Sequence, residues 1–251
     1  MASIIELLVA GAILGFAGGL LGIGGGVFAI PFLALAFGLD QQHSQGTALV
    51  MVVPNVAIGL WRYSKKQALD RRLALSLALP AFPFTFLAAH LATHLPSAPL
   101  RIAFAAFVLA IAIFMAYKAF APNADSATPQ RVYPWPVALI VGAFGGALSG
   151  LFGVGGAAFS VPLMSLLFGL SQTSAQALGL ALVAPGTLVG VATYAWAGDV
   201  DWFLGIPLAL GALFAVPYGV HLAYRMPERR LRLVFSGLMV CSSILLLQHV
   251  G

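Results

Sequence analysis

A glycine-rich segment occurs twice in this chain, with the same residues following it at the same distances. Residues 15–26 read GFAGGLLGIGGG and residues 146–157 read GALSGLFGVGGA, which is an offset of 131 residues (146 − 15). The offset holds without a gap through the rest of the chain. An internal repeat constrains the architecture first, because both halves must fold into the same kind of unit. We therefore predict a first repeat at residues 1–121, a cytoplasmic linker at 122–134 and a second repeat at 135–251.

The composition makes lipid the expected solvent of both repeats. Hydrophobic residues make up 61% of the chain and charged residues 8%, whereas soluble domains average about 25% charged residues. The net charge of +5 comes from bases in short links between apolar runs, which is typical of membrane orientation signals. No continuous basic face exists, so nucleic acid is excluded as a partner. The expected partners are membrane lipid and a small substrate.

The apolar runs predict an all-α polytopic membrane protein. A spanning helix needs about 20 apolar residues. Each repeat begins with a run that is too long for one straight helix, Ile4–Leu39 and Val137–Leu170. We expect each run to form a helical hairpin, broken at Leu21–Gly26 or Phe152–Gly156, that either spans the membrane or re-enters it. The clear spans that follow lie at Gly46–Trp61, Leu73–Ala92, Ile102–Ala119, Ala177–Ala192, Phe203–Ala223 and Leu233–Leu247.

The charges of the links predict that the two repeats are inverted. Bases crowd the links at residues 62–72 and 225–232, whereas the repeat-equivalent links at 197–202 and 94–101 carry almost none. Basic links face the cytoplasm, so equivalent links face opposite sides. The predicted fold is two inverted-topology repeats, each a glycine-broken hairpin plus three transmembrane helices. Both termini then lie outside the cell (inner) membrane. A parallel repeat, in which each long run crosses once, is the alternative.

The inner glycines of each break are the predicted substrate site. Non-helical backbone at membrane depth must be buried in protein or line a cavity, and an exposed helix N-terminus attracts anions. The alternative is close helix packing through small residues, which we expect for the outer glycines Gly15, Gly19, Gly146 and Gly150. The predicted binding residues at the breaks are Gly22, Gly24, Gly25, Gly26, Gly153, Gly155, Gly156 and Ser160.

Polar side chains after each hairpin extend the predicted site. Gln45 and its repeat equivalent Gln176, with Thr47 and Asn55, can donate hydrogen bonds to an anion; interhelical hydrogen bonding is the alternative.

His90 and His221 are candidates for proton coupling, with a hydrogen bond to a neighbour as the alternative. Mid-helix prolines permit hinges, and we assign this role to Pro31, Pro54, Pro162 and Pro185. No metal or cofactor is expected, because neither histidine has a second close ligand in the sequence.

These residues resemble the sulfite exporter TauE/SafE family of membrane permeases. The resemblance rests on the two glycine segments with Pro31 and Pro162, on residues 46–48 (GTA) after Gln45, and on residues 198–202 (GDVDW). It implies transport of sulfur-containing oxyanions or organosulfonates, often as export. Ala177-Leu178 replaces the Gly46-Thr47 pair in the second repeat, so the halves are expected to contribute unequally.

Residues and resemblance together predict a secondary transporter, with export as the expected direction. The anion would bind between the two helix breaks near the membrane midplane and move by alternating access. An importer or a channel for another small organic anion is the alternative. An enzyme is not expected, because the predicted spans contain no nucleophile–base pair and no metal-binding cluster.

Overall fold

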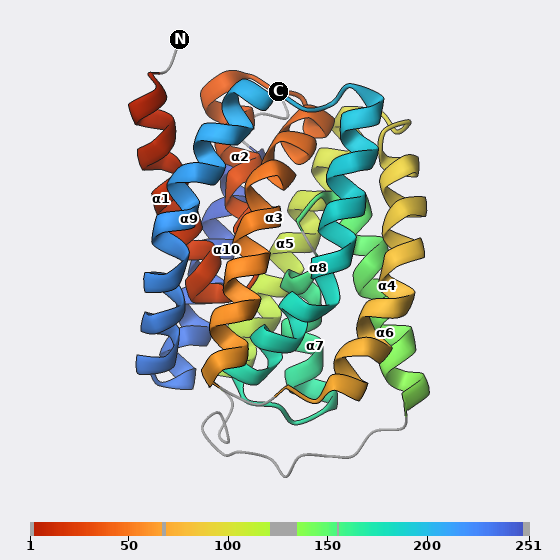
Figure 1. Ribbon diagram of the computed structural model, residues 1–251, viewed down its shortest axis with the longest axis vertical. Coiled ribbons are helices and arrows are strands. Elements are labelled where there is room, and N and C mark those ends of the chain that lie inside the picture. The colour runs from red at the N-terminus through yellow and green to blue at the C-terminus, as the bar shows by residue number, and fades with distance from the viewer. Residues whose placement is uncertain (1–2, 67–68, 121–134, 155, 248–251) are drawn as a thin grey trace.

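Ten helices make up the part of the chain that the computed structural model describes, residues 3–66, 69–120, 135–154 and 156–247, and no strand occurs in it (Figure 1). The helices of the first repeat are α1 (Ile4–Leu21), α2 (Gly26–Phe37), α3 (Gln41–Lys66), α4 (Arg71–Ala92) and α5 (Ser97–Phe120). Those of the second are α6 (Trp135–Phe152), α7 (Ala157–Leu167), α8 (Gln172–Ala197), α9 (Trp202–Arg225) and α10 (Glu228–Leu247). The predicted linker at 122–134 lies outside the described residues.

Seven of the described helices are long and apolar enough to cross a membrane: α1, α3, α4, α5, α6, α8 and α9. Large apolar side chains such as Phe203 and Phe214 are exposed on the outside of the bundle, as lipid contact requires. The prediction of an all-helical, multi-pass membrane protein is confirmed. The predicted span at Leu233–Leu247 belongs to α10, whose first turn carries charged residues and which is not among the seven.

Both predicted helix breaks occur where the glycines cluster. Helix α1 ends at Leu21 and α2 starts at Gly26, and the N-cap residue Gly25 has a φ of 86°. In the second repeat, α6 ends at Phe152 and α7 starts after Gly156, whose φ is 49°. Only glycine adopts these left-handed conformations at low cost. The sequence thus breaks each long apolar run into a helical hairpin.

The first helix of each repeat packs against a helix of the other repeat. Helix α1 packs along α9 of the second repeat, and α6 packs along α4 of the first. A Cβ atom on Gly11 or on its repeat equivalent Gly142 would clash with a carbonyl oxygen of the facing helix, Leu208 or Leu77. Gly15, Gly19, Gly146 and Gly150 make equally close contacts along the same two pairs, which confirms their predicted packing role.

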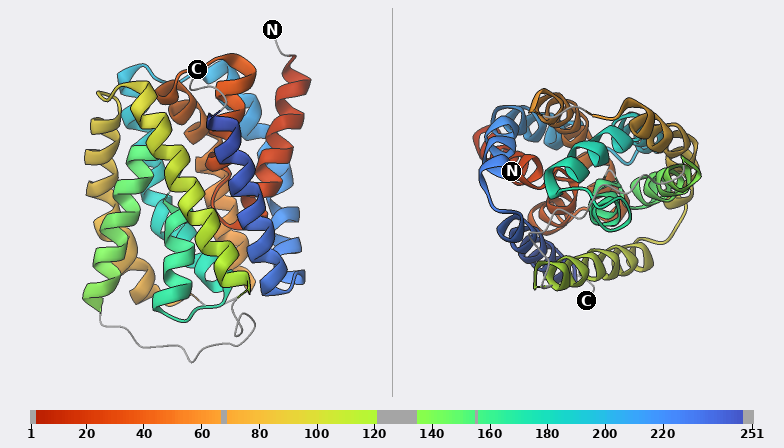
Figure 2. Two further views of the ribbon diagram at one scale, coloured as in Figure 1. Left: turned by 180° about the vertical axis from the view of Figure 1, so that it is seen from behind. Right: turned by 90° about the horizontal axis from the view of Figure 1, so that it is seen from below.

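Two further helix pairs form across the repeats, whereas α2 and α7 pack mainly on α3 and α8 of their own repeats. Helices α3 and α8 pack against each other at the centre, and α5 and α10 pack together at one side of the bundle (Figure 2). In Figure 1, α3 starts at the end of the molecule where α1 begins, whereas α8 starts at the opposite end.

The two ends of the bundle differ in charge. At one end α3 finishes, α4 starts, α5 and α9 finish and α10 starts (Figure 1). We call it the basic end; it carries Arg62, Lys65, Lys66, Arg71, Arg72, Lys118, Arg225, Arg229 and Arg230. The opposite end, called the acidic end, carries Asp40, Asp199 and Asp201, and Arg101 is the basic side chain there.

Candidate functional site

The two helix breaks touch each other inside the bundle. A Cβ atom on Gly26 would lie 3.1 Å from Cα of Val154 and 3.2 Å from the carbonyl oxygen of Gly153. Gly22, Gly24, Gly25, Gly26, Gly153 and Gly156 are all buried. Gly155, also predicted for the site, lies outside the described residues. The first turn of α2 therefore packs directly against the loop that precedes α7.

Both short helices begin without a capping side chain from the described part of the chain. The N-cap residues are Gly25 for α2 and Gly156 for α7, and neither has a side chain that could accept a hydrogen bond. The first N–H groups of a helix have no partner within the helix, and they carry the positive end of its dipole. Two buried helix N-termini thus lie near the centre of the bundle.

Two tyrosine–glutamine pairs flank these breaks. The hydroxyl of Tyr194 lies 2.7 Å from Oε1 of Gln45 and 3.1 Å from the carbonyl oxygen of Gly150. The repeat-equivalent hydroxyl of Tyr63 lies 2.8 Å from Oε1 of Gln176 and 3.1 Å from the carbonyl oxygen of Gly19. The four side chains have an exposed fraction of 0%. Each pair joins one repeat to the other.

The glutamines lie directly on the breaks. A Cβ atom on Gly153 would lie 2.8 Å from Cβ of Gln45, and one on Gly22 would lie 2.5 Å from Cβ of Gln176. Because a tyrosine hydroxyl donates to each Oε1, the carboxamide NH₂ is the part left to donate elsewhere. Nε2 of Gln45 has no hydrogen-bond partner among the described residues, whereas Nε2 of Gln176 lies 3.4 Å from the carbonyl oxygen of Leu20.

Asn55 lies at the middle of α3 and holds the first break. Its Nδ2 donates to the carbonyl oxygen of Gly24 at 3.1 Å, and its buried Oδ1 has no partner in the described chain. Ser160 is also buried, but its hydroxyl donates to the carbonyl oxygen of Gly156 at 2.9 Å. That hydroxyl is therefore used within the first turn of α7.

The structure places three other predicted residues away from the breaks. Thr47 accepts the backbone N–H of Asp201 at 2.9 Å, near the acidic end. His90 and His221 are exposed on the outer faces of α4 and α9. The predicted hinges Pro54 and Pro185 lie inside α3 and α8, and Pro31 and Pro162 lie inside α2 and α7.

Our reading of the sequence missed the two tyrosines. Tyr63 and Tyr194 are 131 residues apart, so the repeat itself could have identified them. Gln41 and Gln172, polar residues that follow the two hairpins in the sequence, were not assigned to the site. They too are repeat equivalents and fully buried, and neither amide atom of either has a partner in the described chain. Among the described residues, no three His, Cys, Asp or Glu side chains are grouped to hold a metal ion.

A helical bundle with paired helix breaks and buried polar groups at its centre has the architecture of a membrane transporter. The comparison with known families agrees: the model described as "Sulfite exporter TauE/SafE" matches residues 7–246. The chain belongs to this family, and it is therefore a transporter rather than an enzyme.

Individual relatives carry the same general description. A "Probable membrane transporter protein" of Xylella fastidiosa is 29% identical, over 96% of this chain and 94% of the relative. A protein with the same general name from Methanocaldococcus jannaschii is 25% identical over 92% of this chain and 88% of the relative. One from Bacillus subtilis is 25% identical over 95% of each chain.

Proposed function

We propose that this protein is a secondary transporter, working as an exporter, of small sulfur-containing oxyanions or organosulfonates. The substrate would bind where the two helix breaks meet. The single observation that carries this proposal is the buried Nε2 of Gln45, which has no partner in the described chain and belongs to a residue packed on Gly153. A buried donor without an acceptor is costly, and an anion would supply the acceptor.

The site would bind the anion without a fixed positive charge. The uncapped N-termini of α2 and α7 supply dipoles and N–H groups, and the carboxamides of Gln45 and Gln176 supply N–H donors. A lysine or arginine at this depth would be costly. The neutral donors fit a small anion that must also leave the site during each transport cycle.

The tyrosine–glutamine pairs would close the site toward each end of the molecule. Tyr194 and Gln45 lie on the acidic side of the breaks, and Tyr63 and Gln176 lie on the basic side. Opening one pair while the other stays closed would give alternating access. Helices α3 and α8 carry both pairs and contain the mid-helix prolines Pro54 and Pro185, which would serve as the hinges.

We further propose that the two halves are inverted repeats and that the basic end faces the cytoplasm. The distribution of lysine and arginine supports this orientation, and both chain termini would then lie outside. An inside-negative potential would drive an anion outward with about 2.3 kcal/mol per charge per 100 mV. If protons are coupled, they would travel on the substrate or through His90 or His221.

The test is a flux measurement on purified protein in liposomes. Sulfite, taurine, sulfoacetate, sulfate and acetate are compared under an imposed potential, with and without a pH gradient. We expect saturable flux of sulfite or a sulfonate well above that of acetate and of protein-free liposomes. Absence of flux for every anion, from protein shown to be folded, would overturn the substrate assignment. Steady conductance far above carrier rates would show that the protein is a channel rather than a secondary transporter.

A further inference from the structure

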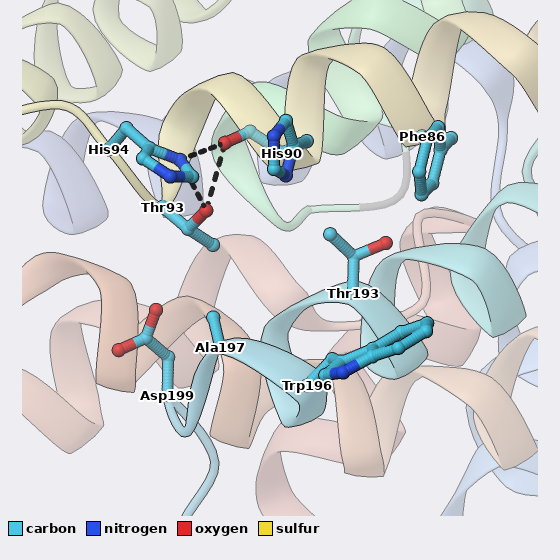
Figure 3. A pocket seen from close by; sticks show the side chains of 8 residues that line it. All are labelled: Phe86, His90, Thr93, His94, Thr193, Trp196, Ala197 and Asp199. Atoms are coloured by element: carbon cyan, nitrogen blue, oxygen red, sulfur yellow. Dashed lines mark hydrogen bonds between the residues drawn. The ribbon is translucent and has the colours of Figure 1, made fainter.

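A cavity of about 530 Å³ lies between α4 and α8 at the acidic end, away from the helix breaks. Figure 3 shows Phe86 and His90 on α4 and His94 in the turn after it, facing Thr193 and Trp196 on α8 and Asp199 in the loop that follows α8. The polar groups Asp199, Thr93 and His94 lie at the loops, whereas Phe86 lies two helical turns below His94. The cavity is therefore charged at the end that lies near the loops, called its outer end, and aromatic at the end that lies deeper along α4.

The polar lining of this cavity is rich in hydrogen-bond acceptors. The hydroxyl of Thr93 donates to the carbonyl oxygen of His90 at 2.8 Å, and that of Thr193 donates to the carbonyl oxygen of Val189 at 2.9 Å. Nδ1 of His94 lies 2.8 Å from the same His90 oxygen, so it carries the proton and leaves Nε2 as an acceptor. Together with the Asp199 carboxylate, these groups suit a ligand that donates several hydrogen bonds.

The charge at the outer end of the cavity is negative. His43 lies 3.0 Å from the Asp40 carboxylate and 3.6 Å from the Asp199 carboxylate. One imidazole can neutralise at most one of these two charges, even when it is protonated. The described residues that line the cavity include no lysine or arginine. Burial raises the pKa of the Asp199 carboxyl, and a bound cation would counteract this effect.

The equivalent cavity at the other end of the molecule has the opposite character. It measures about 490 Å³ and contains Arg62 at the repeat position of Thr193 and His221 at the repeat position of His90. None of the described residues that line it carries a carboxylate. Two cavities of similar size thus differ in the charge of their lining: the cavity at the acidic end has a carboxylate, and the cavity at the basic end has an arginine.

We propose that the cavity at the acidic end binds the primary ammonium headgroup of an aminophospholipid. The ammonium would donate to Asp199 and to Nε2 of His94 at the loop end of the cavity, and Trp196 and Phe86 would line the path of the rest of the lipid (Figure 3). Trp196 is 92% exposed and Phe86 is 48% exposed on the side of the bundle, where lipid surrounds a membrane protein. The acyl chains would continue past Phe86 along the apolar surface of α4.

Native mass spectrometry of the purified full-length protein tests this assignment. The probes are phosphatidylethanolamine, phosphatidylcholine and phosphatidylglycerol with identical acyl chains, and free ethanolamine as competitor. We expect phosphatidylethanolamine to bind most tightly, because phosphatidylcholine lacks N–H donors and phosphatidylglycerol lacks the cation. Free ethanolamine should not displace the lipid, because it lacks the acyl chains. Equal binding of the three lipids, or displacement by ethanolamine at equal concentration, would overturn the proposal.

Asp199→Asn and Asp40→Asn form a matched pair for this experiment. Both remove one carboxylate that faces His43, but only Asp199 lines the cavity. Asp199→Asn should weaken phosphatidylethanolamine binding about fivefold, and Asp40→Asn should leave it unchanged. Trp196→Ala provides a second variant, on an exposed side chain whose loss should not affect folding. Unchanged selectivity in both Asp199→Asn and Trp196→Ala would refute the site.

Discussion

The hydroxyl of Tyr194 lies 2.7 Å from Oε1 of Gln45, so one hydrogen bond fixes the orientation of a carboxamide that belongs to the other repeat. The same hydroxyl lies 3.1 Å from the carbonyl oxygen of Gly150, at the end of α6. A phenol has one proton, so these two acceptors share it. The contact therefore links the central helix α3 to the glycine segment of the second repeat.

Replacing Tyr194 with phenylalanine should remove that link without changing the packed ring. Two buried acceptors lose their donor, which costs about 1–3 kcal/mol in the free energy of unfolding. Denaturant unfolding of the purified protein measures the loss. Tyr117→Phe is the control, because the side chain of Tyr117 is exposed. Equal stability of the two variants would show that the hydrogen bond contributes nothing.

Gln45→Leu and Gln42→Leu should both lower stability, but only Gln45→Leu should also weaken substrate binding. Gln45 Nε2 has no partner in the described chain, so we expect its loss to raise the apparent KM for the anion by about tenfold or more. Gln42 Nε2 instead donates to the carbonyl oxygen of Leu95 at 2.6 Å and to that of Ala92 at 3.3 Å. Its loss should lower stability and leave KM unchanged. Concentration-dependent flux measures the apparent KM, and thermal unfolding measures stability. A KM raised by Gln42→Leu and unchanged by Gln45→Leu would contradict the proposed site.

Gly26→Ala should push the two helix breaks apart. The added methyl would lie 3.1 Å from Cα of Val154, so a backbone segment has to move. The φ of Gly26 is not positive, and alanine adopts it without strain. We expect transport to fall several-fold in protein that still folds. Gly237→Ala on α10 meets open space and should keep full transport while gaining about 0.5–1 kcal/mol of stability. Full transport by the Gly26 variant would argue against substrate binding at the breaks.

Ser242→Ala should destabilise the docking of α10 on the first hairpin. Proline has no N–H group, so Pro31 leaves the carbonyl oxygen of Val27 without its helical partner. The hydroxyl of Ser242 donates to that oxygen at 2.6 Å, and its removal should cost about 1–2 kcal/mol. The neighbouring Ser243 donates to Met239 within its own helix at 3.0 Å, so Ser243→Ala should have little effect. Chemical denaturation of both variants makes the comparison.

The helix breaks could be predicted because their cause is local. Glycine clusters at residues 22–26 and 153–156 interrupt runs that are otherwise uniformly apolar, and the structure breaks the helices there. The packing of Gly15 and Gly146 could be predicted for the same reason, since a small residue every fourth position marks a helix interface. The inverted orientation of the repeats stays a prediction that rests on the link charges.

The partners of individual side chains could not be predicted, because they come from distant parts of the chain. Thr47 was assigned to the site, but its hydroxyl faces the backbone of Asp201. Tyr63 and Tyr194 looked like any aromatic residue in an apolar helix until the fold brought each beside a glutamine of the other repeat. The cavity at the acidic end likewise combines α4 with α8, and no spacing in the sequence links those two helices.

The packing of α1 and α6 against the opposite repeat makes each half of the chain depend on the other. A single repeat on its own would leave the glycine face of its first helix uncovered, because the helix that fits this face belongs to the other repeat. A second copy of the repeat would cover both faces at once, because each first helix fits a helix of the other copy. The covalent chain therefore makes within one molecule the contacts that two copies of one repeat would make in a dimer, although equivalent positions in the halves differ, for example Arg62 in one half and Thr193 in the other.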